Sequence, residues 1–198
     1  MAPTATNHQV LGRPRDTRID TAVLLAAVEL LEETGYQGLT MAAVAARAGT
    51  TKPAVYRRWP SKAQLVYEAV FPLEDQDLIP DGDDLAVDLR TMVVAALELF
   101  SRPAVRAAVP GLLADFSGSP GMHAELQLRL AVPVWGMMHA RIERAIASGQ
   151  ARPDADPDVL IDVIGGTTMM ALAIRPGRAL DDLWVEQVVA LLTRGLLA

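Results

Sequence analysis

The chain has no cysteine among its 198 residues, which excludes disulfides, thiolate catalysis and cysteine-based metal sites. Aromatic residues make up only 5%, and no segment alternates apolar and polar residues beside a hairpin turn. The longest charge-free apolar stretch, 163–174, is shorter than the roughly 20 residues that a membrane-spanning helix needs. No secretory signal is visible in residues 1–10. We therefore expect a cytoplasmic protein without strands and without a membrane partner.

Apolar residues are plentiful by contrast. They make up 51% of the chain, and charged residues make up 21%. Helical periodicity runs through nearly all of the sequence. This combination predicts a globular, all-α protein.

Charge divides the chain unevenly. The net charge of −6 argues on its own against a nucleic-acid partner. Residues 1–70, however, hold eight Lys or Arg and six Asp or Glu, a net +2, whereas residues 71–198 hold ten and eighteen, a net −8. A phosphate polymer is attracted by a local basic patch rather than by the mean charge. The first 70 residues are where such a patch can form.

The helical periodicity and turn residues of the N-terminal third predict a helix-turn-helix domain over residues 17–71. A flexible basic arm is predicted over residues 1–16. The first helix spans 17–34 and stops at Gly35. Short helices follow at 40–48, with Thr40 as N-cap, at 51–59, with Pro53 in the first turn, and at 61–71. Gly49 makes the turn between the second and the third helix tight. Whether arginines of the arm contact DNA or are solvated stays open.

The segment 72–84 is acidic and rich in proline, so we expect a domain boundary there and a second, larger helical-bundle domain over residues 72–198. Its helices are predicted at 85–101, 104–116, 122–148, 157–174 and 180–197. Pro133 should kink the long helix, and the last two should run antiparallel because their connection is short.

The third helix carries the candidate functional surface. Val55 and Trp59 are four residues apart, so both can face the supporting helices. The remaining side chains, together with those that begin the neighbouring helices, suit phosphates and base edges. The candidate DNA-binding residues are Thr40, Thr51, Lys52, Pro53, Tyr56, Arg57, Arg58 and Lys62.

Over residues 17–71 the sequence resembles the TetR family of transcriptional regulators. The matching residues are Leu39-Thr40, Val44-Ala45, Ala48-Gly49, Val55-Tyr56-Arg57-Arg58-Trp59 and Pro60-Ser61-Lys62. Thr50, Arg58 and Trp59 depart from the residues common in the family, so the operator sequence does not follow from the resemblance.

The resemblance implies a repressor that binds a palindromic operator as a homodimer. Its two third helices would enter successive major grooves about 34–36 Å apart. It further implies that Tyr56 and Lys62 hold phosphates with help from Thr40, and that Thr51, Lys52 and Pro53 lie nearest the bases. An unknown small-molecule effector would release the DNA.

The second domain would bind this effector and form the dimer. Candidate effector-binding residues are larger side chains of its helices, although core packing is favoured for each of them: Met92, Phe100, Leu112, Phe116, Trp135, Met138, His139 and Met169. Candidate dimer residues come from the broad apolar faces of the last two helices, where some of them are expected to seal the chain's own core instead: Val159, Val163, Thr167, Met170, Trp184, Val188, Leu191 and Leu192.

Two other classes of function compete with this reading. Asp83, Asp84 and Asp88 resemble the aspartate-rich Mg²⁺ site of all-α isoprenoid synthases, but they are also explained as caps and dipole partners at a helix start. A protein adaptor that uses the helix-turn-helix without DNA is the other alternative. We expect no catalytic residue, no metal site and no cofactor.

Overall fold

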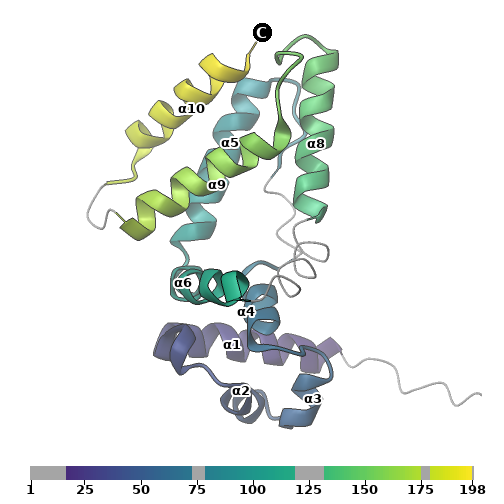
Figure 1. Cartoon of the computed structure of the whole chain (residues 1–198), viewed down its shortest axis with the longest axis vertical. Helices are drawn as coiled ribbons and strands as arrows, with labels where there is room; N and C mark the ends of the chain where they lie inside the picture. Colours follow the sequence, from purple (N-terminus) through teal and green to yellow (C-terminus); the bar gives the residue numbers. More distant parts are fainter. Residues whose placement is uncertain (1–16, 73–78, 119–131, 175–178, 198) are drawn as a thin grey trace, which may run out of the picture.

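The structure is a computed structural model that describes residues 17–72, 79–118, 132–174 and 179–197 (Figure 1). Within these ranges the regular secondary structure is helical, apart from one isolated bridge between Ala151 and Leu197. The predicted all-α class is confirmed. None of the described helices is long and apolar enough to cross a membrane.

The first four helices begin and end close to where the sequence predicts. They are α1 (Thr17–Gly38), α2 (Met41–Arg47), α3 (Lys52–Tyr56) and α4 (Lys62–Val70). The side chains of Thr40, Thr51 and Ser61 accept hydrogen bonds from backbone N–H groups in the first turns of α2, α3 and α4. Such caps satisfy donors that a helix start leaves unpaired. Gly35, with φ of 67° and ψ of 178°, interrupts the helix at the predicted stop, and a further helical turn follows it within α1.

The second half contains α5 (Leu85–Ser101), α6 (Pro103–Gly118), α8 (Val132–Ala147), α9 (Pro157–Ile174) and α10 (Asp182–Leu196). Residues 122–131 of the expected long helix lie outside the described residues. Pro133 lies in the first turn of α8, where its missing N–H breaks no hydrogen bond within that helix. In Figure 1, α10 runs back in the direction opposite to α9, and both helices pack against α5.

The buried apolar side chains form two cores. The first core contains residues of α1–α4 together with Leu99 of α5 and Ala104, Val105, Ala108 and Leu112 of α6. α6 lies across α1 and α4 (Figure 1) and packs against both. The second core is built by α5, α8, α9 and α10. α5 and α6 thus join the two cores, and α6 belongs by packing to the helices that precede it.

Candidate nucleic-acid interface

The turn between α2 and α3 has the geometry of a helix-turn-helix. Gly49 has φ of 64°, a conformation that side chains bearing a Cβ rarely adopt. The N–H of Thr50 donates to the carbonyl of Ala45 at 2.9 Å, which closes the end of α2. α3 begins at Lys52, three residues after Gly49, with Thr51 as its N-cap. The short helix α3 therefore projects at a fixed angle from α2, at the lower end of the molecule in Figure 1.

Two buried side chains hold α3 in place, as the spacing of four residues predicts. Val55 is fully buried and Trp59 is 4% exposed. The indole Nε1 of Trp59 donates to the carboxylate of Glu68 in α4 at 2.9 Å. Trp59 follows the end of α3 by three residues, and its buried indole with a satisfied N–H anchors the segment directly after α3. The other side of α3 is free to meet a partner.

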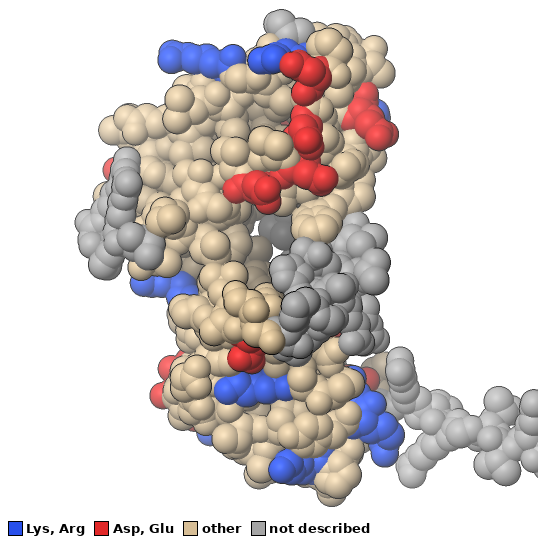
Figure 2. Space-filling view, in the orientation of Figure 1, with Lys and Arg blue, Asp and Glu red and all other residues tan. Residues whose placement is uncertain are grey.

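That other side is exposed and partly cationic. Thr51, Lys52, Pro53, Tyr56 and Arg57 are all exposed. The ammonium of Lys52 lies 5.6 Å from the ring centroid of Tyr56, so the two side chains share one flank of the helix. In Figure 2, Lys and Arg side chains are spread over the lower part of the molecule and also lie at its top edge, and a row of acidic side chains crosses the upper part. The acidic side chains of this face thus gather mainly on the upper part.

The side chains of Thr40 and Thr51 cap α2 and α3, and both can still contact a ligand. The hydroxyl oxygen of Thr40 accepts from Ala43 N at 3.1 Å, and that of Thr51 accepts from Ala54 N at 3.3 Å. Each hydroxyl keeps its proton for a further acceptor such as a phosphate oxygen. Both residues are exposed, so the predicted role and the capping role are compatible.

The prediction that Arg58 belongs to the DNA-binding surface is wrong. Its side chain is only 13% exposed and forms an ion pair with Asp20 of α1. It also donates to the carbonyl of Ala54 at 3.3 Å. Arg58 lies two residues beyond the end of α3, and its side chain reaches back to α1. Arg58 therefore braces α3 against α1 and is not part of the exposed surface.

Lys62 is partly buried, whereas Lys52 of α3 is exposed. The ammonium of Lys62 donates to the backbone carbonyl of Tyr36 at 2.6 Å and lies 4.2 Å from the centroid of the Tyr36 ring. Burial lowers the pKa of Lys62, while the nearby charge of Asp115 acts in the opposite direction. Sequence reasoning found Lys62 and missed these neighbours. The only signal for Tyr36 was its place directly after the helix-ending Gly35.

The comparisons with known proteins agree with this geometry. Residues 79–192 match the family model described as Tetracyclin repressor-like, C-terminal domain. Residues 23–69 match the model of bacterial regulatory proteins, tetR family. The chain belongs to the TetR family. It is a DNA-binding transcriptional regulator and not an enzyme.

Curated relatives and solved structures of the TetR family extend over most of the chain. An uncharacterized HTH-type transcriptional regulator of Mycobacterium tuberculosis, Rv1556, is 31% identical over 164 residues, 80% of each chain. The DNA-binding transcriptional repressor TetR of Mycobacteroides abscessus is 28% identical over 171 residues, 85% of this chain and 88% of its own. The crystal structure of the TetR family transcription regulator SCO0332 has a TM-score of 0.70 at 28% identity, covering 91% of this chain and 100% of the other.

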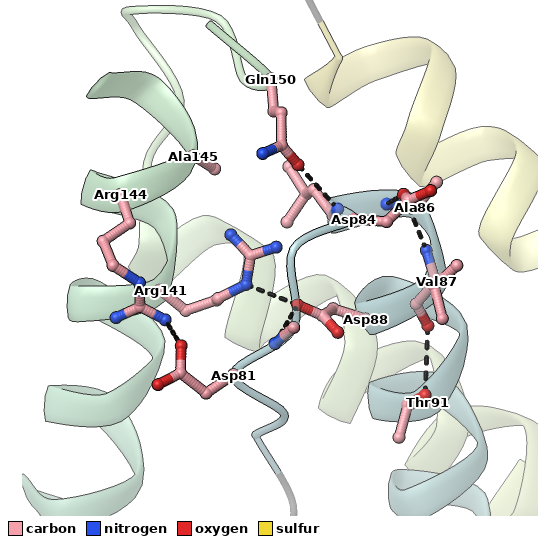
Figure 3. A network of polar contacts seen from close by, with 12 residues as sticks. Asp81, Asp84, Ala86, Val87, Asp88, Thr91, Arg141, Arg144, Ala145 and Gln150 are labelled. Carbon is pink, nitrogen blue, oxygen red and sulfur yellow. Dashed lines mark hydrogen bonds and ion pairs between the residues drawn. The ribbon is translucent and has the colours of Figure 1, made fainter. Parts of the chain in front are cut away.

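Two of the three aspartates that suggested a Mg²⁺ site have structural partners in this TetR-family chain. Asp84 caps α5 by accepting from Ala86 N and Val87 N. Asp88 is buried and accepts from Arg141 Nε of α8 at 2.5 Å (Figure 3). Asp83 is exposed. No group of three metal-binding side chains is found among the described residues. The explanation by caps and ion pairs therefore accounts for Asp84 and Asp88.

The candidate effector-binding residues do not gather in one place. Phe100, Leu112 and Phe116 contribute to the first core, whereas Met92 and Met138 are buried in the second. Trp135 and Met169 are partly buried. His139 Nε2 lies 2.8 Å from the carboxylate of Asp158 in α9. Five of the eight residues thus pack in or against the cores, which is the alternative that the sequence left open.

The candidate dimer residues fall into two groups. Val159, Val163, Thr167, Met170 and Leu191 are exposed. Trp184, Val188 and Leu192, by contrast, are at most 9% exposed and belong to the second core. These three lie four residues apart along α10, on the side that packs against α5. The prediction for these three is wrong, because the chain buries them against itself.

Proposed function

We propose that this TetR-family regulator is a repressor that binds a palindromic operator as a homodimer and is released by a small-molecule effector. The observation that carries the proposal is α3 itself. Val55 and Trp59 anchor it from within, and Thr51, Lys52 and Tyr56 are left exposed on the outside. A helix held rigidly with an exposed polar face suits insertion into a major groove. In the cell the protein would act in the cytoplasm, without a cofactor.

In this proposal some exposed side chains contact base edges and others contact phosphates. Thr51, Lys52 and Pro53 begin α3 and would lie nearest the base edges. Tyr56 and Arg57 lie at its end and would contact phosphates, together with Thr40 and Lys62. Contacts to phosphates position a protein on the duplex, and contacts to base edges select the sequence. Arg58 has no place in this division because it pairs with Asp20.

The outer faces of α9 and α10 support the homodimer. Val159, Val163 and Met170 are 55%, 41% and 54% exposed, and Leu183 and Leu191 of α10 are 66% and 72% exposed. Val159, Val163, Thr167 and Met170 recur every three or four residues, so they share one face of α9. Aliphatic side chains in such a contiguous exposed set are typical of a protein interface. A second copy would cover them as part of a four-helix interface.

Aromatic side chains packed against the first core support an effector site. All three phenylalanines of the sequence join Tyr67 in one partly buried cluster. Ring centroids are 4.8 Å apart for Tyr67 and Phe71, 6.2 Å for Tyr67 and Phe116, and 6.3 Å for Phe71 and Phe100. The cluster joins α4, α5 and α6. An effector bound there would act directly on α4, and a hundredfold preference for the DNA-free state is worth about 2.7 kcal/mol.

Selection of bound duplexes from a random pool tests the proposal. A repressor of this kind should recover a two-fold symmetric sequence, which reports the operator and the dimer together. Binding to that sequence should weaken linearly in log affinity against log salt. A protein adaptor would recover no sequence and would show no salt dependence with DNA. Recovery of a single asymmetric site would exclude the homodimer on the operator.

A further inference from the structure

Tyr36 lies where three helices meet. It belongs to the last turn of α1, after the kink at Gly35, and is 5% exposed. Its ring packs on Gly111 of α6 so closely that a Cβ at Gly111 would lie 2.1 Å from a ring carbon. Only glycine permits this approach at that point of α6. The ring is therefore fixed by the helix that links the two cores.

The hydroxyl of Tyr36 is fixed as well. It donates a hydrogen bond to the carboxylate of Asp115, one turn beyond Gly111 in α6. Burial and the neighbouring carboxylate both raise the pKa of the Tyr36 hydroxyl, so it stays a donor. A hydrogen bond to a charged acceptor is stronger than one between neutral groups. α6 thus holds Tyr36 both at its ring and at its hydroxyl.

Lys62 rests on the same tyrosine from the other side. Its ammonium donates to the Tyr36 carbonyl at 2.6 Å and lies 4.2 Å from the ring centroid. These two contacts use the carbonyl and the π-face of one residue. An ammonium has three N–H donors, so two donors stay available for a phosphate. The contacts also fix a long side chain that would otherwise lose rotamer freedom on binding DNA.

We infer that Tyr36 is a positioning residue for DNA binding: it holds the Lys62 ammonium ready for a phosphate and connects that contact to α6. The inference rests on the proposed function, since it gives Lys62 its phosphate. A movement of α6 relative to α1 moves the ring and the hydroxyl of Tyr36, and with them Lys62. The proposed effector site includes Phe116 of α6, so an effector that moves α6 reaches a DNA contact through Tyr36 and Lys62.

The salt dependence of operator binding tests the inference. Loss of one phosphate contact reduces the slope of log affinity against log salt by about 0.9. We expect Lys62→Ala to reduce the slope by this amount for each bound chain. Tyr36→Leu, which removes the ring, should cause the same reduction although Lys62 is intact. The double variant should show no further reduction. Tyr36→Phe, which keeps the ring under Lys62, should retain the wild-type slope.

Two matched controls separate positioning from stability. Leu30→Ala removes another buried side chain of α1, one with no role in the proposed sites, and should leave the slope unchanged even where it lowers stability. Gly111→Ala should reduce the slope as Tyr36→Leu does, whereas Gly118→Ala in the same helix, with no atom within 4 Å of its added Cβ, should not. Circular dichroism establishes that each variant is folded. Where Gly111→Ala fails to fold, Tyr36→Leu decides.

Two results overturn the inference. An unchanged slope for Tyr36→Leu shows that Lys62 needs no positioning. A further fall in the double variant shows that the two residues act independently. Failure of the proposed function looks different, since then the wild-type chain itself recovers no operator from the random pool.

Discussion

The first and the second core are both built from packed helices, yet they expose opposite kinds of side chain. Around the first core, α3 exposes Lys52, Tyr56 and Arg57. Around the second, α9 and α10 expose aliphatic side chains such as Met170 and Leu191. The interiors alone would not distinguish the two regions, because both are apolar. The exposed cations of the first region suit DNA, and the exposed aliphatic face of the second region supports the proposed contact with a second copy of the chain.

The interiors differ in one respect. The buried charged residues of the described chain, Asp88 and Arg141, both lie in the helices of the second core, with side chains 5% and 3% exposed. They join the first turn of α5 to α8 (Figure 3), and the N–H of Gly82 also donates to Asp88 at 3.1 Å. A buried pair of this kind specifies how two helices meet more than it adds stability. The first core is fixed instead by side-chain shape, by helix caps and by polar contacts that are less buried, such as the ion pair of Arg58 with Asp20.

The largest effect should follow from breaking the buried pair. Asp88→Ala leaves the Arg141 charge buried without its carboxylate, so we expect the free energy of unfolding to fall by about 3–5 kcal/mol. Urea denaturation followed by circular dichroism measures it. Glu186→Ala, which removes the exposed partner of Arg90, should cause no measurable change. An equal fall in the free energy of unfolding for the two variants would show that the buried pair contributes no more than an exposed one.

The exposed aliphatic face should be sensitive to charge. Leu191→Glu places a carboxylate in the proposed dimer interface, and we expect it to weaken dimerisation at least about a hundredfold, or about 2.7 kcal/mol. Sedimentation over a range of protein concentrations measures the change. The matched control is Leu25→Glu in α1, at a leucine that is 58% exposed but lies outside the proposed interface. A dimer unaffected by Leu191→Glu would show that the second region has another partner.

Variants of Lys52 and Lys62 compare a base contact with a phosphate contact within the first region. Lys52→Ala should relax the preferred operator sequence and weaken binding to it by about tenfold, because a contact to a base edge is worth about 1–3 kcal/mol. Lys62→Ala should weaken all sequences alike. Repeating the selection from a random pool with each variant separates the two. Identical behaviour of the variants would contradict the division between base and phosphate contacts.

The smallest effect concerns a helix cap of the second region. Asp84→Ala removes the acceptor for Ala86 N and Val87 N and should lower the free energy of unfolding by about 1 kcal/mol. Asp83→Ala, at the exposed neighbouring aspartate, serves as the control and should have little effect. Thermal unfolding monitored for both variants gives the comparison. A larger loss for Asp83→Ala would reopen the question of what this acidic segment binds.

Local rules in the sequence were enough to predict most of the helices. Thr40, Thr51 and Ser61 cap the helices that they were expected to cap or begin, because capping depends on residues only two or three positions away. The sequence also showed that Val55 and Trp59 face inward. Local rules also placed the interruption of α1 at Gly35. They failed at Trp184, which faces the chain's own core.

Contacts between distant residues were beyond the reach of these rules. Tyr36 and Asp115 are 79 positions apart, and no periodicity or motif connects them. Arg57 and Arg58 are neighbours in the same motif, yet the structure exposes one and pairs the other with Asp20. The sequence by itself determined the helices, the basic character of the first region and the membership of the family, because these depend on local spacing and composition. Only the tertiary structure decided which cations are exposed and which apolar faces stay uncovered, because burial depends on the helices packed opposite each side chain.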